Sequence, residues 1–206
     1  MAGVENYGDI HFDVLKEIGN IGAGNAITSL SKMLNKKVDM RVPKVSLVDF
    51  KFISDFIGGP ENLIIGILIG LSGDVNGIMM FLVEKNSAHR LIDILFSSTS
   101  ANENDDFSEM ELSALQEVGN ILSGSYLGSF ATLINKSIIP SIPYLAIDMA
   151  QAILSVPAIE FGKVSDKVLL IESLFEAENK DVSGFFVLVP DPPSFQTILT
   201  SLGVMI

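Results

Sequence analysis

Residues 13–43 read DVLKEIGNIGAGNAITSLSKMLNKKVDMRVP, and residues 113–143 read SALQEVGNILSGSYLGSFATLINKSIIPSIP. The two stretches align without a gap at a constant offset of 100 residues. The residues shared by both copies, in the numbers of the first, are Leu15, Glu17, Gly19, Asn20, Ile21, Gly24, Ser29, Asn35, Lys36 and Pro43. Self-similarity of this extent indicates that the chain is a duplication, built from two related halves.

The two halves remain similar beyond these stretches. Apolar runs at residues 63–71 and 167–175 predict buried strands, and a second strand-like run follows in each half at 78–83 and 185–189. Short helices are predicted at 50–57 and 149–156, and each half ends in an amphipathic helix, at 86–96 and 193–202. Each half therefore predicts a long helix, a strand, a short helix, two strands and a final helix.

This order predicts an α+β fold, in which two long motif-bearing helices pack against an antiparallel β-sheet with pseudo-twofold symmetry. We expect a single domain over residues 1–206, made of halves at about 10–97 and 108–206. The polar segment 97–107, SSTSANENDDF, is interpreted as the linker between them.

Composition narrows the classes of function. A net charge of −12 disfavours binding to nucleic acid and to anionic membranes. The absence of cysteine excludes disulfides and thiolate sites, and two histidines do not favour a histidine metal cluster. We see no signal peptide and no apolar run near the ~20 residues that span a bilayer. A cytoplasmic protein without membrane insertion is expected.

The first motif predicts a helix with a narrow polar stripe. A rotation of about 100° per residue brings its four motif residues within about 60° of one another. The first stripe consists of Asp13, Glu17, Asn20 and Gly24, and the second of Ser113, Glu117, Asn120 and Gly124. The apolar face beneath is predicted to contain Val14, Leu15, Ile18 and Ile21 in the first copy and Ala114, Leu115, Val118 and Ile121 in the second.

The stripe has the character of a docking site. Glu17 and Asn20 are neighbours on the helix, with Cβ atoms about 5–6 Å apart. The carboxylate supplies a fixed charge, and the amide both donates and accepts hydrogen bonds. Gly24 leaves room for another backbone to approach, so we expect the stripe to insert into a partner's cleft. Pro43 and Pro143 are interpreted as turn or strand-edge residues without a chemical role.

A solvated helix face is the simplest alternative for such a stripe. Duplication argues against it, because Glu and Asn are retained in both copies while Lys16 corresponds to Gln116. A two-carboxylate acid–base pair of Glu17 and Glu117 is disfavoured by symmetry, since its two members need different environments. The acidic residues at 103–106 lie in the polar linker and are interpreted as solvated, so no metal site is predicted.

The spacing Asp/Ser-x3-Glu-x2-Asn-x22-Pro, met by Asp13, Glu17, Asn20 and Pro43 and again 100 residues later, resembles the CheC family of bacterial chemotaxis phosphatases. The segments EIGNIGAGNA and EVGNILSGSY are similar to that family, and the resemblance covers essentially the whole chain. Two complete motifs in one chain resemble its two-site members. They differ from the CheX type, with one site per subunit, and the FliY type, with a further flagellar switch domain.

The resemblance implies dephosphorylation of phosphorylated CheY. It implies that Asn20 and Asn120 orient the water that attacks the aspartyl phosphate, and that Glu17 and Glu117 pair with a lysine of the regulator. It further implies a Mg²⁺ ion on CheY, no cofactor in this chain, and binding to the receptor deamidase CheD. Residues 145–156 are compatible with a docking helix for CheD or with a core helix.

Two other functions stay open at this point. A non-catalytic adaptor that sequesters CheD or phospho-CheY would share the same surface, and a flagellar-switch scaffold is disfavoured by the missing extra domain. Internal duplication already supplies the symmetry that a dimer would provide, so a monomer is expected.

Overall fold

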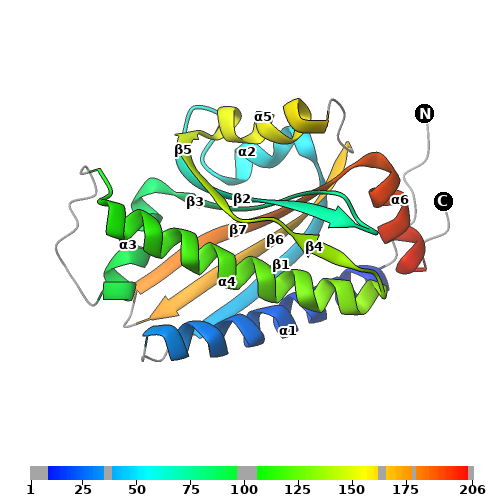
Figure 1. Ribbon diagram of the computed structural model, residues 1–206, viewed down its shortest axis with the longest axis horizontal. Helices are drawn as coiled ribbons and strands as arrows, with labels where there is room; N and C mark the ends of the chain where they lie inside the picture. The colour runs from blue at the N-terminus through cyan, green and yellow to red at the C-terminus, as the bar shows by residue number, and fades with distance from the viewer. Residues whose placement is uncertain (1–8, 35–38, 97–105, 162–165, 178–179, 204–206) are drawn as a thin grey trace.

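The computed structural model describes residues 9–34, 39–96, 106–161, 166–177 and 180–203. The two motif helices are α1 (Asp9–Leu34) and α4 (Glu109–Ile134), and their bounds differ by the same 100 residues as the copies in the sequence. The two helices pack together and run antiparallel on one face of the sheet (Figure 1).

The ends of α4 are fixed by its own sequence. The backbone N–H of Ser108 donates to Glu111 Oε2 at 2.7 Å, and the N–H of Glu111 donates to Ser108 Oγ at 3.4 Å. This capping box satisfies N–H groups that the helix itself leaves free. The helix ends at Asn135, which adopts the left-handed conformation with φ of 50°, a conformation that asparagine tolerates well.

The sheet is shared between the two halves. Its strands are β1 (Asp39–Asp49), β2 (Leu63–Gly73), β3 (Gly77–Glu84), β4 (Ile138–Pro140), β5 (Tyr144–Met149), β6 (Lys167–Ala177) and β7 (Lys180–Pro190). Their order is β1-β6-β7-β3-β2-β4, with β5 also paired to β2, and all of these pairings are antiparallel. Each half thus adds its first strand to the hairpin of the other half.

Two helical layers cover the sheet (Figure 1). One face packs against α1, α4 and α3 (Lys85–Phe96), and Ile198 of α6 (Pro192–Ser201) joins the same core. The opposite face packs against α2 (Ile53–Phe56), which follows the 3-10 turn Phe50–Phe52, and against α5 (Ala150–Phe161). Successive side chains of β2 point to opposite faces of the sheet, so Ile67 packs in the core under α1 and α4, and Leu68 packs in the core under α2 and α5.

The two motif prolines lie at the two edges of the sheet. Pro43 belongs to β1, where the pairing with β6 shifts between Arg41 and Lys44. Pro143 lies in the break between β4 and β5. Proline lacks the N–H that a central strand requires, so edges and irregularities are where it fits. The prediction of a turn or strand-edge place is confirmed for both.

The predicted order of elements is confirmed, with differences in the second half. The strand expected after α4 is divided into β4 and β5, and the helix expected at 149–156 begins at Ala150 and ends at Phe161. The helix considered at 145–156 is wrong over residues 145–149, which belong to β5. Ile153 and Leu154 of α5 are buried, so this helix packs on the core. The predicted linker falls outside the described residues at 97–105, and Phe107 packs against the core.

Candidate functional site

The second motif forms an exposed stripe on α4. Ser113, Glu117, Asn120 and Gly124 are all exposed. Beneath them Leu115 and Val118 are buried at 1% and 0% exposure, while Ala114 and Ile121 are partly buried against the same core. The predicted rotation of this helix is confirmed, because its apolar face meets the sheet and its motif face is open to solvent.

The first motif forms the matching stripe on α1. Glu17, Asn20 and Gly24 are exposed, as their counterparts are on α4. Asp13 lies in α1 and Pro43 in β1, and the side chains of both fall outside the described residues. Since α1 and α4 pack on the same face of the sheet, both stripes belong to one layer of the molecule (Figure 1).

The predicted apolar face of α1 is wrong at Ile21. Its side chain is 50% exposed, whereas Ala23, Ala26 and Leu30 are buried at 2%, 0% and 2%. Over residues 21–32 the buried face of α1 is therefore rotated toward its small residues, and the side chains of Val14, Leu15 and Ile18 lie outside the described residues. Large apolar side chains were the basis of the prediction, but this face meets another helix closely, and there small residues permit the contact.

Gly22 lies where the two motif helices approach each other closely. A Cβ atom on Gly22 would lie 2.9 Å from Cδ1 and 3.1 Å from Cα of Tyr126. Gly119 is similarly confined on the sheet side, where a Cβ would collide with the side chain of Ile67. Gly24 and Gly124, in contrast, have no atom within 4 Å of such a Cβ, so the motif glycines border open space.

Tyr126 fills the contact opposite Gly22. It is 2% exposed, its ring centroid lies 4.6 Å from that of Phe186, and its hydroxyl shares a 3.1 Å hydrogen bond with Ser173 Oγ. Burial raises the pKa of Tyr126 to about 12, and the hydrogen bond with Ser173 opposes the rise in part. The phenol therefore stays neutral and structural, beneath the exposed stripes.

The second stripe is tied to the edge of the sheet by a hydrogen bond that the sequence did not suggest. Gln116 Nε2 donates to the carbonyl oxygen of Pro143 at 2.7 Å. Gln116 immediately precedes Glu117, and Pro143 is the proline that completes the second motif. The helix and the β4–β5 connection are thus joined next to the candidate site.

Among the residues that the structure describes, other polar groups form no second cluster of this kind. His89 is buried, and its ring stacks on Phe107 at 4.1 Å with neither nitrogen hydrogen-bonded within the described chain. Within the ranges that the structure describes, no three His, Asp or Glu side chains are grouped so as to hold a metal ion. No helix in those ranges is both long and apolar enough to cross a membrane.

Known proteins share this arrangement. The CheC-like family matches residues 10–47 and 110–145, the segments that carry the two motifs. CheY-P phosphatase CheC of Bacillus subtilis (strain 168) is 33% identical over 194 residues, which cover 93% of this chain and 93% of that protein. Flagellar motor switch phosphatase FliY of the same organism is 31% identical over 135 residues, covering 66% of this chain and 35% of FliY.

A solved structure supports the fold. The crystal structure of Thermotoga maritima FliY matches with a TM-score of 0.72 at 21% identity, covering 95% of this chain and 97% of that one. The resemblance drawn from the motif is confirmed by the sequence similarity to CheY-P phosphatase CheC over 93% of the chain. With one relative at 33% identity across nearly its whole length and both motif segments matched, this chain belongs to the CheC-like family.

Proposed function

We propose that this chain is a CheY-P phosphatase, which hydrolyses the aspartyl phosphate of a chemotaxis response regulator. The observation that carries the proposal is the similarity to CheY-P phosphatase CheC across 93% of both chains. The exposure of Glu17, Asn20, Glu117 and Asn120 supports it, since a docking site must be open to its partner.

We propose that the asparagines orient the attacking water. Phosphoryl transfer depends mainly on positioning and electrostatics, and an amide that accepts one hydrogen and donates another fixes a water without adding charge beside the phosphate. A carboxylate in the same place would be repelled by the phosphate oxygens. Because α1 and α4 are long and packed on the sheet, Asn20 and Asn120 are held on rigid elements.

We assign the docking role to the glutamates. Glu17 and Glu117 each lie one helical turn from the asparagine of their stripe and are exposed. A carboxylate there suits a charge-assisted hydrogen bond with a lysine of the regulator, which sets the register of the asparagine. Gly24 and Gly124 border open space one turn further on, which supports close approach of the partner's backbone. The Mg²⁺ ion is assigned to the regulator.

The experiment that tests the proposal is phosphate release from phospho-CheY. A small amount of this chain should clear a large excess of phospho-CheY, because a catalyst is regenerated after each cycle. An adaptor that only sequesters its partner would protect or hold a stoichiometric amount and no more. Clearance that stops at one or two CheY molecules per chain would contradict the phosphatase proposal and favour the adaptor.

We also propose, from the family resemblance alone, that the chain binds CheD. Exposed apolar side chains on β5 and its flanks are compatible with a protein partner: Tyr144, Ile147 and Met149 are 68%, 38% and 49% exposed. Co-elution of the two purified proteins tests this, and separate elution at micromolar concentration would contradict it.

A further inference from the structure

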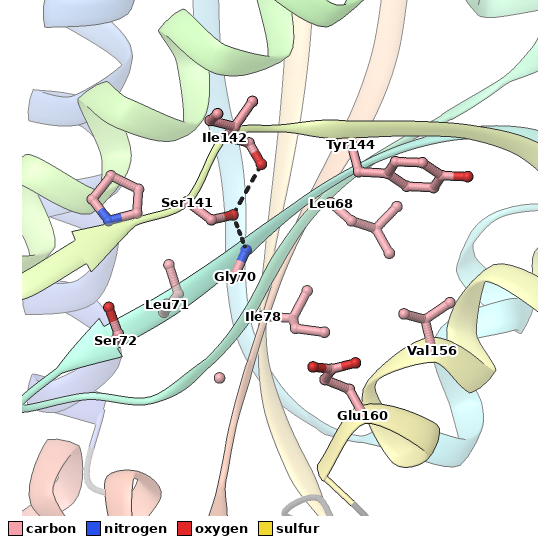
Figure 2. A pocket seen from close by; sticks show the side chains of 12 residues that line it. Leu68, Gly70, Leu71, Ser72, Ile78, Ser141, Ile142, Tyr144, Val156 and Glu160 are labelled. Atoms are coloured by element: carbon pink, nitrogen blue, oxygen red, sulfur yellow. Dashed lines mark hydrogen bonds between the residues drawn. The ribbon is translucent and has the colours of Figure 1, made fainter.

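The turn of residues 141–143 connects β4 to β5 beside the second motif helix. Its backbone is held by the sheet: Ser141 N–H donates to the Gly70 carbonyl at 2.8 Å, and Gly70 N–H donates to Ser141 Oγ at 2.9 Å. Ser141 Oγ also donates to the Ile142 carbonyl at 2.9 Å (Figure 2). The turn is thus ordered by side-chain and backbone contacts rather than left as a free loop.

The same turn is held from the helix side. The carbonyl of Pro143 accepts from Gln116 Nε2 at 2.7 Å. Gln116 and Asn120 are four residues apart on α4, so they are neighbours on its surface, about 5–6 Å apart at Cβ. The peptide that joins Pro143 to Tyr144, immediately after Ile142, therefore lies at the border of the second Glu–Asn stripe.

Ile142 is the outward side chain of this turn. It is 88% exposed, the largest exposed fraction among the large apolar side chains of the described residues. A single exposed apolar residue needs no explanation by itself. Ile142 differs because hydrogen bonds hold the backbone on both sides of it, at Ser141 and at Pro143. It also lines a cavity of about 540 Å³ (Figure 2), and the residue after it is hydrogen-bonded to α4 next to the stripe.

The first copy has no equivalent. The residue 100 positions earlier is Val42, which is 3% exposed and packs in the core beneath α1. There the strand continues through a register shift as β1 instead of breaking into two strands. The second copy thus exposes an apolar side chain next to the proline that is hydrogen-bonded to α4, whereas the corresponding side chain of the first copy is buried.

We propose that Ile142 is an apolar contact for the response regulator docked at the second site, and that Gln116 is the positioning residue that holds it there. The inference rests on the proposed function, because it takes the regulator as the occupant. A side chain whose backbone is already ordered loses little freedom on docking. Burying its apolar surface then favours the complex, so the second site binds the regulator more tightly than an unaided stripe.

The test separates the two sites with asparagine variants. Asn20→Ala leaves the second site as the source of activity, and Asn120→Ala leaves the first. Ile142→Asp in the Asn20→Ala background should raise the KM for phospho-CheY about tenfold, with kcat within about twofold. The same change in the Asn120→Ala background should alter neither constant.

A matched control uses Ile159, which is 77% exposed on α5. Ile159→Asp adds the same charge on the helix that packs against the opposite face of the sheet, and it should leave KM unchanged in both backgrounds. An Asn20→Ala protein that is active but indifferent to Ile142→Asp would overturn the inference while the proposed function stands. An inactive Asn20→Ala protein beside an active wild type would also overturn it. A wild type without activity would instead defeat the proposed function.

Gln116 is tested by removing and restoring its donor. Gln116→Met has similar length but no N–H, so it should raise KM several-fold in the Asn20→Ala background. Gln116→Lys restores a donor, as Lys16 has in the first copy, and should recover a KM near that of the parent. Equal KM values for Met and Lys would remove Gln116 from this role, and a fall in stability without a change in KM would show a structural role only.

Discussion

The two motif helices are alike on their outer faces and unlike on their inner ones. Outside, α1 and α4 both expose Glu, Asn and Gly at the same spacing. Inside, α1 presents Gly22, Ala23 and Ala26, and α4 presents Leu122, Ser123 and Tyr126 at the corresponding places. Gly22 of α1 lies directly against Tyr126 of α4, so the small residue on one inner face makes room for the large residue on the other. The outer faces kept their residues, as a shared partner would require.

The largest expected effect on stability comes from a substitution that makes the inner face of α4 resemble that of α1. Tyr126→Ala gives α4 the residue that α1 carries at Ala26. It removes a buried ring and its hydrogen bond, so it should lower the free energy of unfolding by about 3–5 kcal/mol. Urea unfolding measures this, with Tyr144→Ala, at a site 68% exposed, as the control. Equal losses for the two variants would mean that Tyr126 does not fill the contact.

The next largest effect is the dependence on pH of the stability that Tyr126 contributes at the same contact. Tyr126 has a pKa raised from 10.0 to about 12 by burial, so the unfolded chain loses this proton at lower pH than the folded one. The stability that Tyr126 contributes is complete below pH 10 and is lost as the pH rises toward about 12. This difference in pKa between the unfolded and the folded chain corresponds to about 2–3 kcal/mol in the free energy of unfolding.

Comparison of wild type with Tyr126→Phe isolates that contribution. The wild type should lose stability more steeply than the variant between about pH 10 and about pH 12. Urea unfolding at several alkaline pH values provides the measurement. Parallel pH profiles for the two proteins would show that the Tyr126 hydroxyl ionises equally readily in both states.

The smallest effect contrasts two glycines of α1. Gly22→Ala should destabilise the protein by about 1–3 kcal/mol, because the new methyl group meets the backbone and ring of Tyr126. Gly24→Ala, two residues on, should stabilise it by about 0.5–1 kcal/mol, because its methyl group meets open space and helical alanine is favoured over glycine. Thermal unfolding of the pair is the measurement, and effects of the same sign would contradict the assigned faces.

Much of the architecture could be predicted from sequence. The duplication follows from the alignment of the two copies. The order of elements and the exposed stripe on α4 follow from local periodicity, which depends on neighbours along the chain. The exposure of Ile21 could not be predicted, because the rotation of α1 is decided by a close helix contact at Gly22. The apolar face of α1 was predicted from its large apolar residues alone. Glycine and alanine were not counted, although small residues are what allow two helices to pack closely.

The pairing of strands from different halves could not be predicted from the sequence, for a different reason. The sequence predicted a strand after each motif helix but not the partner of that strand, so the exchange of edge strands between halves could not be predicted. In the same way, the contact of Gln116 with Pro143 depends on the break between β4 and β5. In the sequence, Gln116 is only a position at which the two copies differ, with Lys16 in the first copy, and no local pattern indicates its contact with Pro143.

We propose that each copy of the motif forms a site and that the asparagine of each site orients the water that attacks the phosphate. The most direct measurement is the rate of phosphate release from phospho-CheY with Asn20→Ala, Asn120→Ala and the double variant. Asn25→Ala is the matched control, since Asn25 is exposed on the same helix but outside the stripe. We predict partial activity in each single variant, none above the basal rate in the double variant, and full activity with Asn25→Ala. A folded double variant that still accelerates phosphate release would contradict the account.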